Sequence, residues 1–371
     1  MFRRFASSLG LRKRGSLARV AAALPVLVAL LLGCTAPVAA PGQPAGGAAL
    51  APSGASASAS APAAQRPHVR AAYTAEAASE LPLWVANDAG LFAENGLDVA
   101  VERVAGGSSK AMQVMLAGEL DVAQIGGTAV VDAQLAGADV VSIATAIPVV
   151  GMSVYGDASI ARLDDLRGKS IAITRAGTIT DFGARLALSR QGLAPETDVG
   201  LIQTGGVPET MAAMQSGNVP AGILLPPFDV PARKLGFHEV LDVASLGLEF
   251  QHNGLTVQRD YLTANDDTLQ RFVRAYAAAI ARAHQDKAFT KQVIGKYSST
   301  DDDEALESGY AAFGDRYLAR VPYPTVGQFQ SIIDFTAERD PRARDLKAAN
   351  LIDDHFVRTL EQSGYVDTLY R

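Results

Sequence analysis

Two segments, GGSSKAMQVMLAG at residues 106–118 and GGVPETMAAMQSG at residues 205–217, decide how this chain is expected to fold. Each opens with a glycine pair, continues as a helical pattern with Met at i and i+3, and closes on a glycine, which suits the position after a helix where a positive φ is favoured. Short apolar runs typical of strands follow at 121–125 and 221–225. The similarity spans 20 positions without a gap and predicts one such element in each of two similar lobes, with a cleft between them.

The sequence around these segments alternates short β-type runs with helical patterns, and it becomes helical after about residue 261. Such alternation predicts an α/β fold with mostly parallel sheets. The expected strands are 69–74, 97–103, 121–125, 140–146, 152–155, 170–174, 199–203, 221–225, 239–243 and 254–258. The expected helices are 83–93, 108–117, 128–136, 179–189, 208–215, 227–235, 266–288, 290–297, 302–317, 325–337 and 353–362.

The N-terminus has the order of features found in secreted proteins. Six basic residues and no acidic residue precede an apolar run from Val20 to Leu32, which is shorter than the roughly 20 residues of a membrane-spanning helix and fits a signal-peptide core. The run ends in Leu31-Leu32-Gly33-Cys34, which resembles the bacterial lipobox and implies cleavage before Cys34 and a lipid on its thiol. The alternative is an ordinary signal peptide with a chance cysteine, although Cys34 is the only cysteine in 371 residues.

Residues 34–67 are almost entirely Ala, Pro, Gly and Ser, a composition that predicts a disordered tether behind the lipidated cysteine. Removal of residues 1–33 takes away six of the 33 basic residues and none of the 39 acidic ones, which leaves a net charge of −12. Nucleic-acid binding demands basic patches, so this charge argues against it. About 300 residues remain, enough for two lobes.

Motifs of enzymes and metal sites are missing from the sequence. It contains neither GxSxG nor HExxH, and the histidines are scattered without metal-ligand spacing. Gly168-Lys169-Ser170 lacks the first glycine of a phosphate-binding loop and leads into a strand, so we interpret it as a turn. We expect no catalytic residue, no metal and no cofactor.

Small and hydroxyl residues recur where expected strands end and helices begin. They are Gly106-Gly107-Ser108-Ser109, Gly126-Gly127-Thr128 and Gly177-Thr178-Ile179-Thr180-Asp181. A helix N-terminus offers free backbone N–H groups and a positive dipole end, so such loops can hold an anion or a polar head group. The alternative for any one loop is a simple N-cap, but several loops of this kind favour a binding site at the carboxyl ends of the strands.

A family resemblance covers roughly residues 69–243. The segments PLWVANDAGLFAENGLDV (82–99), GELDVA (118–123) and LDDLRGKSIAI (163–173) resemble the nitrate/sulfonate/taurine and thiamine-precursor (pyrimidine) class of ABC-transporter substrate-binding proteins. The resemblance implies a two-lobed periplasmic-binding-protein fold (type 2) with a two-strand hinge. Mapped here, lobe one takes 68–147 plus 255–371, lobe two takes 155–245, and the hinge takes 148–154 and 246–254.

The resemblance also implies a role. The chain is expected to be the monomeric, extracytoplasmic solute-binding component of an ABC importer, held on the outer face of the cell membrane or in the periplasm by the lipid on Cys34. It would deliver a small organic solute, either a sulfonate or nitrate-like anion or a pyrimidine-type heterocycle, to the transmembrane permease subunits. The alternatives are a sensor or accessory lipoprotein without a permease, and an enzyme similar to the yeast pyrimidine-precursor synthases.

The binding residues carried over from the resemblance lie in the loops between strands and helices. Trp84 can stack on a flat ligand or pack in the core, and we expect it in the cleft; Arg175 can pair with an anion or face solvent. The expected ligand-binding residues are Ser79, Glu80, Leu81, Pro82, Trp84, Gly107, Ser108, Gly127, Thr128, Arg175, Gly177, Thr178, Ile179, Thr180, Pro226, Pro227 and Phe228.

Overall fold

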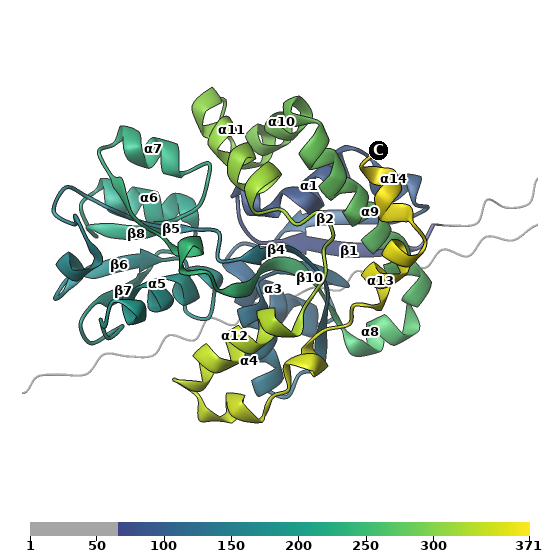
Figure 1. The fold of residues 1–371 in the computed structure, drawn as a ribbon, viewed down its shortest axis with the longest axis horizontal. Coiled ribbons are helices and arrows are strands. Elements are labelled where there is room, and N and C mark those ends of the chain that lie inside the picture. The colour runs from purple at the N-terminus through teal and green to yellow at the C-terminus, as the bar shows by residue number, and fades with distance from the viewer. Residues whose placement is uncertain (1–65) are drawn as a thin grey trace, which may run out of the picture. The chain divides into compact units, whose positions relative to one another are not determined.

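A computed structural model describes residues 66–371; the expected signal peptide, Cys34 and nearly all of the expected tether lie outside the described residues. The described residues form two five-stranded sheets, in the orders β2-β1-β3-β10-β4 and β7-β6-β8-β5-β9. Each sheet with its covering helices forms one lobe (Figure 1). The strands are β1 His68–Tyr73, β2 Asp98–Arg103, β3 Val122–Ile125, β4 Val140–Val149, β5 Ser153–Gly156, β6 Ser170–Ile173, β7 Gly200–Gln203, β8 Ala221–Leu224, β9 His238–Asp242 and β10 Glu249–Gln258.

Both sheets are mixed, with the reversed strand in the same place in each order. β10 runs antiparallel to β3 and β4, and β5 runs antiparallel to β8 and β9. These reversed strands are the ones through which the chain enters a sheet from the other lobe, after β4 and after β9. The expected parallel pairing holds for the remaining neighbours β1–β2, β1–β3, β6–β7 and β6–β8.

The internal similarity of the sequence corresponds to equivalent elements in the two sheets. Helix α3 (Gly107–Leu116) joins β2 to β3, and α6 (Val207–Gln215) joins β7 to β8. The first glycine of each pair has nearly the same φ, 105° at Gly106 and 106° at Gly205. The paired methionines of both helices are buried in the core.

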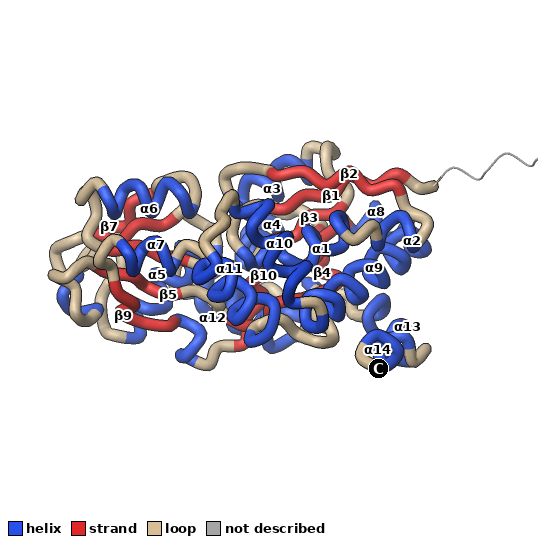
Figure 2. The backbone as a smooth tube through the Cα atoms, turned by 90° about the horizontal axis from the view of Figure 1, so that it is seen from above, coloured by secondary structure: helices blue, strands red, loops and turns tan. Residues whose placement is uncertain are grey.

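Helices cover both sheets, and the C-terminal third of the chain adds helices to lobe one (Figure 2). Besides α3 and α6, the helices are α1 Leu81–Asp88, α2 Leu91–Glu94, α4 Gly127–Leu135, α5 Ile179–Arg190, α7 Asp229–Lys234, α8 Arg259–Ala264, α9 Asp266–Gln285, α10 Lys287–Ser298, α11 Asp303–Tyr310, α12 Val326–Ala337, α13 His355–Gln362 and α14 Tyr365–Leu369. α1 packs against α9 and α10, and α12 packs against β10 and α4. Short helical turns lie at Ala78–Glu80, Leu163–Leu166, Val243–Leu246, Ala311–Arg316, Pro341–Asp345 and Ala348–Leu351.

Several expected boundaries differ from the structure. The helix expected at 83–93 is broken at Gly90, whose φ of 71° ends α1 and separates it from α2. β4 and β10 are longer than expected, and their pairing reaches Val149 and Glu249, so part of the expected hinge at 246–254 belongs to the first sheet. The chain therefore crosses between the sheets at 150–152 and at 243–248.

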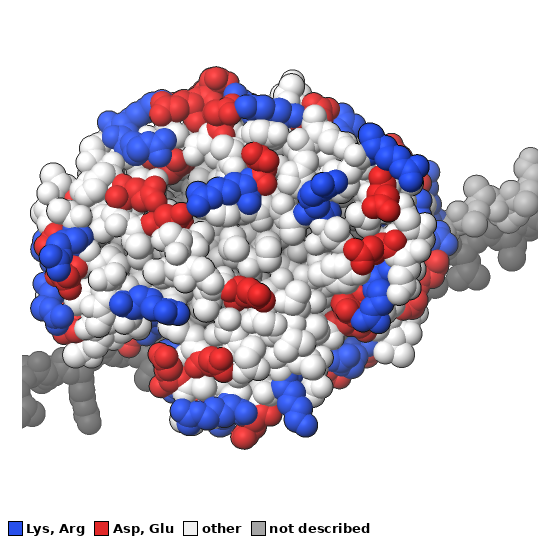
Figure 3. All heavy atoms as spheres, viewed as in Figure 1, with Lys and Arg blue, Asp and Glu red and all other residues white. Residues whose placement is uncertain are grey.

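The surface of the described part carries charges of both signs. On the face in Figure 3, acidic and basic side chains are interspersed. Among residues 66–371, no helix has the length and apolar character needed to cross a membrane.

Candidate functional site

A cavity of about 90 Å³ opens between the two lobes, at the carboxyl ends of the parallel strands. Lobe one supplies the loops after β1, β2 and β3, together with two neighbouring residues of β10, and lobe two supplies the loops after β6, β7 and β8. The lining residues are Thr74, Ala75, Glu76, Ser79, Glu80, Arg103, Ala105, Gly106, Gly107, Ser108, Gly126, His252 and Asn253 from lobe one, and Thr174, Thr178, Ile179, Thr180, Gly205, Gly206, Val207, Pro208, Glu209 and Leu225 from lobe two.

The N-termini of α3, α5 and α6 meet at this cavity, one from lobe one and two from lobe two. Their N-cap residues, Gly106, Thr178 and Gly206, make no side-chain cap hydrogen bond. The first-turn N–H groups of these helices are therefore not hydrogen-bonded to N-cap side chains. In α6 one of these groups is missing, because Pro208 has no N–H. Free N–H groups and aligned helix dipoles favour negative charge at this point.

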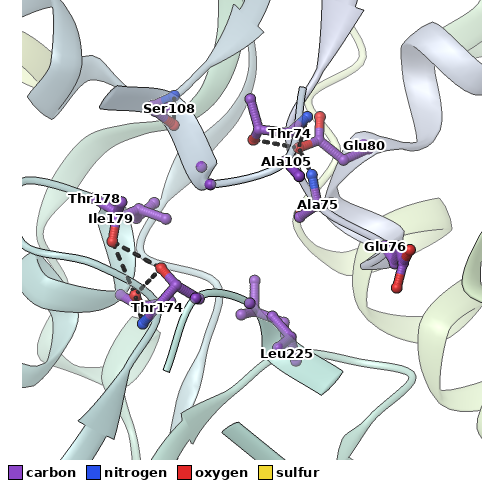
Figure 4. Close-up of a pocket in the computed structure, with 18 of the residues that line it drawn as sticks. Thr74, Ala75, Glu76, Glu80, Ala105, Ser108, Thr174, Thr178, Ile179 and Leu225 are labelled. Atoms are coloured by element: carbon purple, nitrogen blue, oxygen red, sulfur yellow. Dashed lines mark hydrogen bonds between the residues drawn. The ribbon is translucent and has the colours of Figure 1, made fainter. Parts of the chain in front are cut away.

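Hydroxyl groups line the lobe-two wall and are tied to one another (Figure 4). The Oγ1 atoms of Thr174, Thr178 and Thr180 lie within 2.7–3.0 Å of one another. Thr178 also donates to the carbonyl of Arg175 at 2.7 Å, and Thr180 accepts from the backbone N–H of Thr174. This network fixes the loop before α5, so its N–H groups are held ready for a ligand.

Glu80 forms the floor of the lobe-one side and is only 2% exposed. Its Oε1 accepts from the N–H and hydroxyl of Thr74 and from the N–H of Ala75 (Figure 4), and its Oε2 accepts from Gln124 and Asn253. Burial raises the pKa of Glu80, and the donated hydrogen bonds oppose that rise because they favour the carboxylate. All of these hydrogen bonds come from other residues of the protein, so the carboxylate stabilises the structure at the floor of the cavity.

His252 and Asn253 reach the cavity from β10, far away in the sequence. Nδ1 of His252 accepts the backbone N–H of Gly151 at 3.1 Å, which joins β10 to the crossing segment at 150–152. Complete burial lowers the pKa of His252 to about 3, so the ring is neutral at physiological pH. A neutral imidazole is what this contact requires, because a protonated Nδ1 has no lone pair to accept with.

Charged side chains stand at the mouth of the cavity. Arg103 is paired with Glu76, and Glu209 is exposed on the first turn of α6. The basic side chain that lines the cavity is thus already neutralised within the described residues. An anion bound here would rely on the backbone N–H groups and hydroxyls rather than on a free cation.

The structure brings part of the expected site together. Six of the predicted binding residues in the glycine–hydroxyl loops and in the short helix η1 (Ala78–Glu80) line the cavity, and so does Ile179. Those six are Ser79, Glu80, Gly107, Ser108, Thr178 and Thr180.

Trp84 is placed in the core, which corrects the expectation of a cleft wall. It is fully buried and does not line the cavity. Its ring stacks on Tyr297 at 4.7 Å with an interplanar angle of 7°, and Tyr73 meets it edge-on at 5.6 Å. The physical reason is that α1 turns this side chain towards α9 and α10, against which it packs. Leu81 and Pro82 on the same helix are likewise buried and outside the cavity lining.

Other predicted residues lie outside the cavity lining, either where the lobes touch or, for Gly127, in the packing of lobe one. Thr128 donates to the carbonyl of Gly177 at 3.1 Å across the lobes, and Pro226 accepts from the N–H of Ala78 at 3.1 Å. Gly127 allows α4 to pack on α12, because a Cβ there would lie 2.5 Å from Ile332. These residues therefore serve lobe contact and packing.

The last predicted residues also fall outside the lining. Arg175 is exposed, and its Nε lies 3.3 Å from the position of a Cβ at Gly106, so it stands beside the cavity rim. Pro227 and Phe228 lead into α7, which joins lobe two to α11 through hydrogen bonds and ion pairs.

Sequence reasoning missed the β10 residues and the loop at 205–209. Asn253 and His252 lie at the expected hinge, and nothing in their immediate sequence indicates a ligand. The loop at 205–209 did carry a signal, because the internal similarity makes it the counterpart of the loop at 106–110. If one loop lines a cleft between similar lobes, its counterpart is expected to line it too.

Solved structures with the same architecture define the class. The alkanesulfonate-binding protein SsuA from Xanthomonas axonopodis pv. citri, bound to MOPS, matches with a TM-score of 0.68 and 19% identity, over 79% of this chain and all of that one. The periplasmic nitrate-binding protein NrtA from Synechocystis PCC 6803 matches with a TM-score of 0.69 and 14% identity, over 82% of this chain and 91% of that one. The chain therefore has the periplasmic-binding-protein fold.

The family follows from the sequence comparisons. The family described as NMT1/THI5 like matches residues 78–288, and the chain belongs to it. A Bacillus subtilis (strain 168) protein, YtlA, whose name gives it as a candidate binding protein, is 28% identical over 231 residues, which cover 60% of this chain and 68% of that protein.

Proposed function

We propose that this protein captures a small, oxyanion-bearing organic solute between its lobes and delivers it to the permease of an ABC importer. The observation that carries the proposal is the meeting of the α3, α5 and α6 N-termini at one hydroxyl-lined cavity. Such N-termini bind sulfonate, phosphate or carboxylate groups without a charged side chain. The named functions of the sulfonate- and nitrate-binding relatives agree with this chemistry.

The composition of the cavity favours an oxyanion over a flat heterocycle. No Phe, Tyr or Trp stands among the described residues that line it, so a pyrimidine ring would find no aromatic side chain of these types to stack on. The described residues also hold no group of His, Cys, Asp and Glu suited to a metal ion. We therefore place organic sulfonates first among the solutes.

Lobe closure is the proposed means of capture. Lobe one would take residues 68–147 and 255–371, lobe two would take 155–245, and the segments 148–154 and 246–254 would act as the hinge. Support comes from the two crossings of the chain between the sheets and from the His252–Gly151 hydrogen bond, which joins the crossing at 150–152 to β10. A ligand held by helices of both lobes stabilises the closed arrangement by its differential affinity for it.

Calorimetry on the purified protein tests the proposal. Ethanesulfonate, 2-hydroxyethanesulfonate, taurine, nitrate and a hydroxymethylpyrimidine are titrated separately, and each mixture is then analysed for chemical change. We expect at least one sulfonate to bind with no product formed. Conversion of a bound solute would establish an enzyme instead, and binding of the pyrimidine alone would overturn the oxyanion assignment.

Membrane attachment through Cys34 forms part of the proposal. The support is the basic N-terminus, the short apolar run and the lipobox-like Leu31-Leu32-Gly33-Cys34. The lipid would hold the monomeric binding protein on the outer face of the cell membrane, close to its permease. Cys34→Ser is expected to release the protein from the membrane fraction, and unchanged attachment of that variant would contradict the lipoprotein assignment.

A further inference from the structure

Asn253 is held in a single orientation at the floor of the cavity. Its Nδ2 donates to Oε2 of Glu80 at 2.9 Å and to the carbonyl of Ser79 at 3.0 Å. Both amide hydrogens are thereby used on acceptors. A flipped amide would set its oxygen against a carboxylate and a carbonyl, so the Oδ1 position is fixed as well.

The Glu80 carboxylate that orients Asn253 is itself fixed from the opposite side. Gln124 donates to Oε2 of Glu80 at 2.6 Å, while its own Oε1 accepts from the hydroxyl of Tyr276 at 2.7 Å. Tyr276 and Gln124 are fully buried. The chain Tyr276–Gln124–Glu80–Asn253 thus runs from the core to the cavity with every donor assigned, and it ends on the amide oxygen of Asn253.

That amide oxygen is left without a hydrogen-bond partner among the described residues. Asn253 is 3% exposed and lines the cavity, and its Oδ1 is buried. A buried acceptor without a donor is costly, and the cost is removed when a donor is supplied. The neighbouring Glu80 cannot supply one, because its oxygens already accept from five protein donors.

We propose that Asn253 is a specificity-determining residue that accepts a hydrogen bond from an N–H or O–H group of the solute. The inference rests on the proposed function: the oxyanion lies at the helix N-termini, and a second, donor-bearing group faces Asn253. The preferred class is then an organic sulfonate with a hydroxyl or amino substituent, rather than an unsubstituted alkanesulfonate or nitrate. A site built for a donor discriminates against the analogue that lacks it, since the acceptor is then left unpaired.

The test compares probes of nearly equal size by calorimetry. Ethanesulfonate lacks the donor, while 2-hydroxyethanesulfonate and taurine carry one at the second carbon. We expect the wild-type protein to bind at least one donor-bearing probe about 10-fold more tightly than ethanesulfonate. In Asn253→Ala that ratio is expected to fall towards one, and in Asn218→Ala, the same change at an exposed turn, it is expected to stay at the wild-type value.

The possible outcomes distinguish failure of the role of Asn253 from failure of the proposed function. Binding of all three sulfonates with equal affinity by the wild-type protein would overturn the role of Asn253 and leave the proposed function standing. Binding of none of them would overturn both. Because the ratio is taken within one protein sample, partial misfolding of Asn253→Ala changes the amount of active protein and not the preference. If that variant does not fold at all, the wild-type ratio still decides.

Discussion

Replacement of Gly107 by Ala is expected to hold the lobes apart. Gly107 lies at the start of α3 and lines the cavity, with a φ of 76°. A Cβ at this position would lie 2.9 Å from Cγ2 of Thr178 in lobe two. Thr178 is buried and fixed by hydrogen bonds to Thr174, Thr180 and the carbonyl of Arg175. It cannot easily turn aside.

The free-energy cost of Gly107→Ala has two parts, and a matched variant separates them. A positive φ costs an alanine about 1–2 kcal/mol, and Gly118→Ala carries the same cost, since φ there is 77° and no atom lies within 4 Å of its Cβ. The contact with Thr178 is at least about 0.5 Å shorter than ordinary carbon–carbon packing, and such overpacking costs about 1–3 kcal/mol. Opening of the lobes relieves this second cost, so closure and solute affinity are expected to fall about 5- to 150-fold.

Fluorescence energy transfer between the lobes measures the effect. Glu119 and Asn218 are exposed beside the distal ends of α3 and α6, and both can be changed to cysteine for labelling in a Cys34→Ser background. We expect Gly107→Ala and Gly118→Ala to lower the melting temperature alike. Only Gly107→Ala is expected to reduce the fraction of closed molecules at a given sulfonate concentration.

A second substitution identifies the contact responsible. Thr178→Ser removes Cγ2 and keeps the hydroxyl that organises the loop, so it is expected to restore closure in the Gly107→Ala background. If the double variant stays as open as Gly107→Ala, the added methyl group does not act through Thr178, and the reasoning is refuted.

Three further predictions concern the core and the crossings. The fluorescence of Trp84, the chain's only tryptophan, is expected to resist acrylamide quenching and to keep its emission maximum when a sulfonate binds, because the ring is fully buried away from the cavity; a shift on binding would place it at the site. Tyr276→Phe is expected to cost about 1 kcal/mol of unfolding free energy in urea titrations, since it takes the donor from Oε1 of Gln124; an unchanged midpoint would mean that the network is not needed. The pKa of His252 is about 3 in the folded protein and about 6.5 in the unfolded chain, so the unfolded state takes up the proton first as pH falls. The unfolding free energy is therefore expected to fall, by up to the order of 4 kcal/mol, as pH drops from 6.5 towards 3. His252→Gln is expected to flatten that slope and the exposed control His68→Gln to keep it; equal slopes would remove His252 as the cause.

The fold was predictable because its signals are local. Strand–helix alternation and the repeated glycine–helix–glycine pattern correctly gave the equivalent elements β2-α3-β3 and β7-α6-β8. The reversed strands were not predictable in this way, because the direction of β5 and β10 depends on where the chain crosses between sheets. The break at Gly90 carried a local signal, an isolated glycine within a helical pattern, that the prediction did not use.

The site was predictable only where its residues come from helix starts. Gly107, Ser108, Thr178 and Thr180 line the cavity because parallel strands bring their carboxyl ends to one edge. Asn253 comes from an antiparallel strand whose burial on both faces gives no alternation to interpret. Its importance depends on its contacts, above all with Glu80 and the backbone of Ser79, which no sequence pattern encodes.

The charge of the protein and the chemistry of the cavity act over different distances. Residues 66–371 carry 27 basic and 39 acidic side chains, so the overall field opposes an approaching anion. Exposed charges are screened within about 8 Å at physiological ionic strength, whereas the N–H groups of α3, α5 and α6 act at contact distance inside a buried site, where hydrogen bonds are strongest. Selectivity is then decided by geometry. The fixed N–H groups select the oxyanion, and Oδ1 of Asn253 selects a hydrogen-bond donor. A protein that attracted anions by net charge would gather inorganic anions as readily as the solute, and this arrangement avoids that competition.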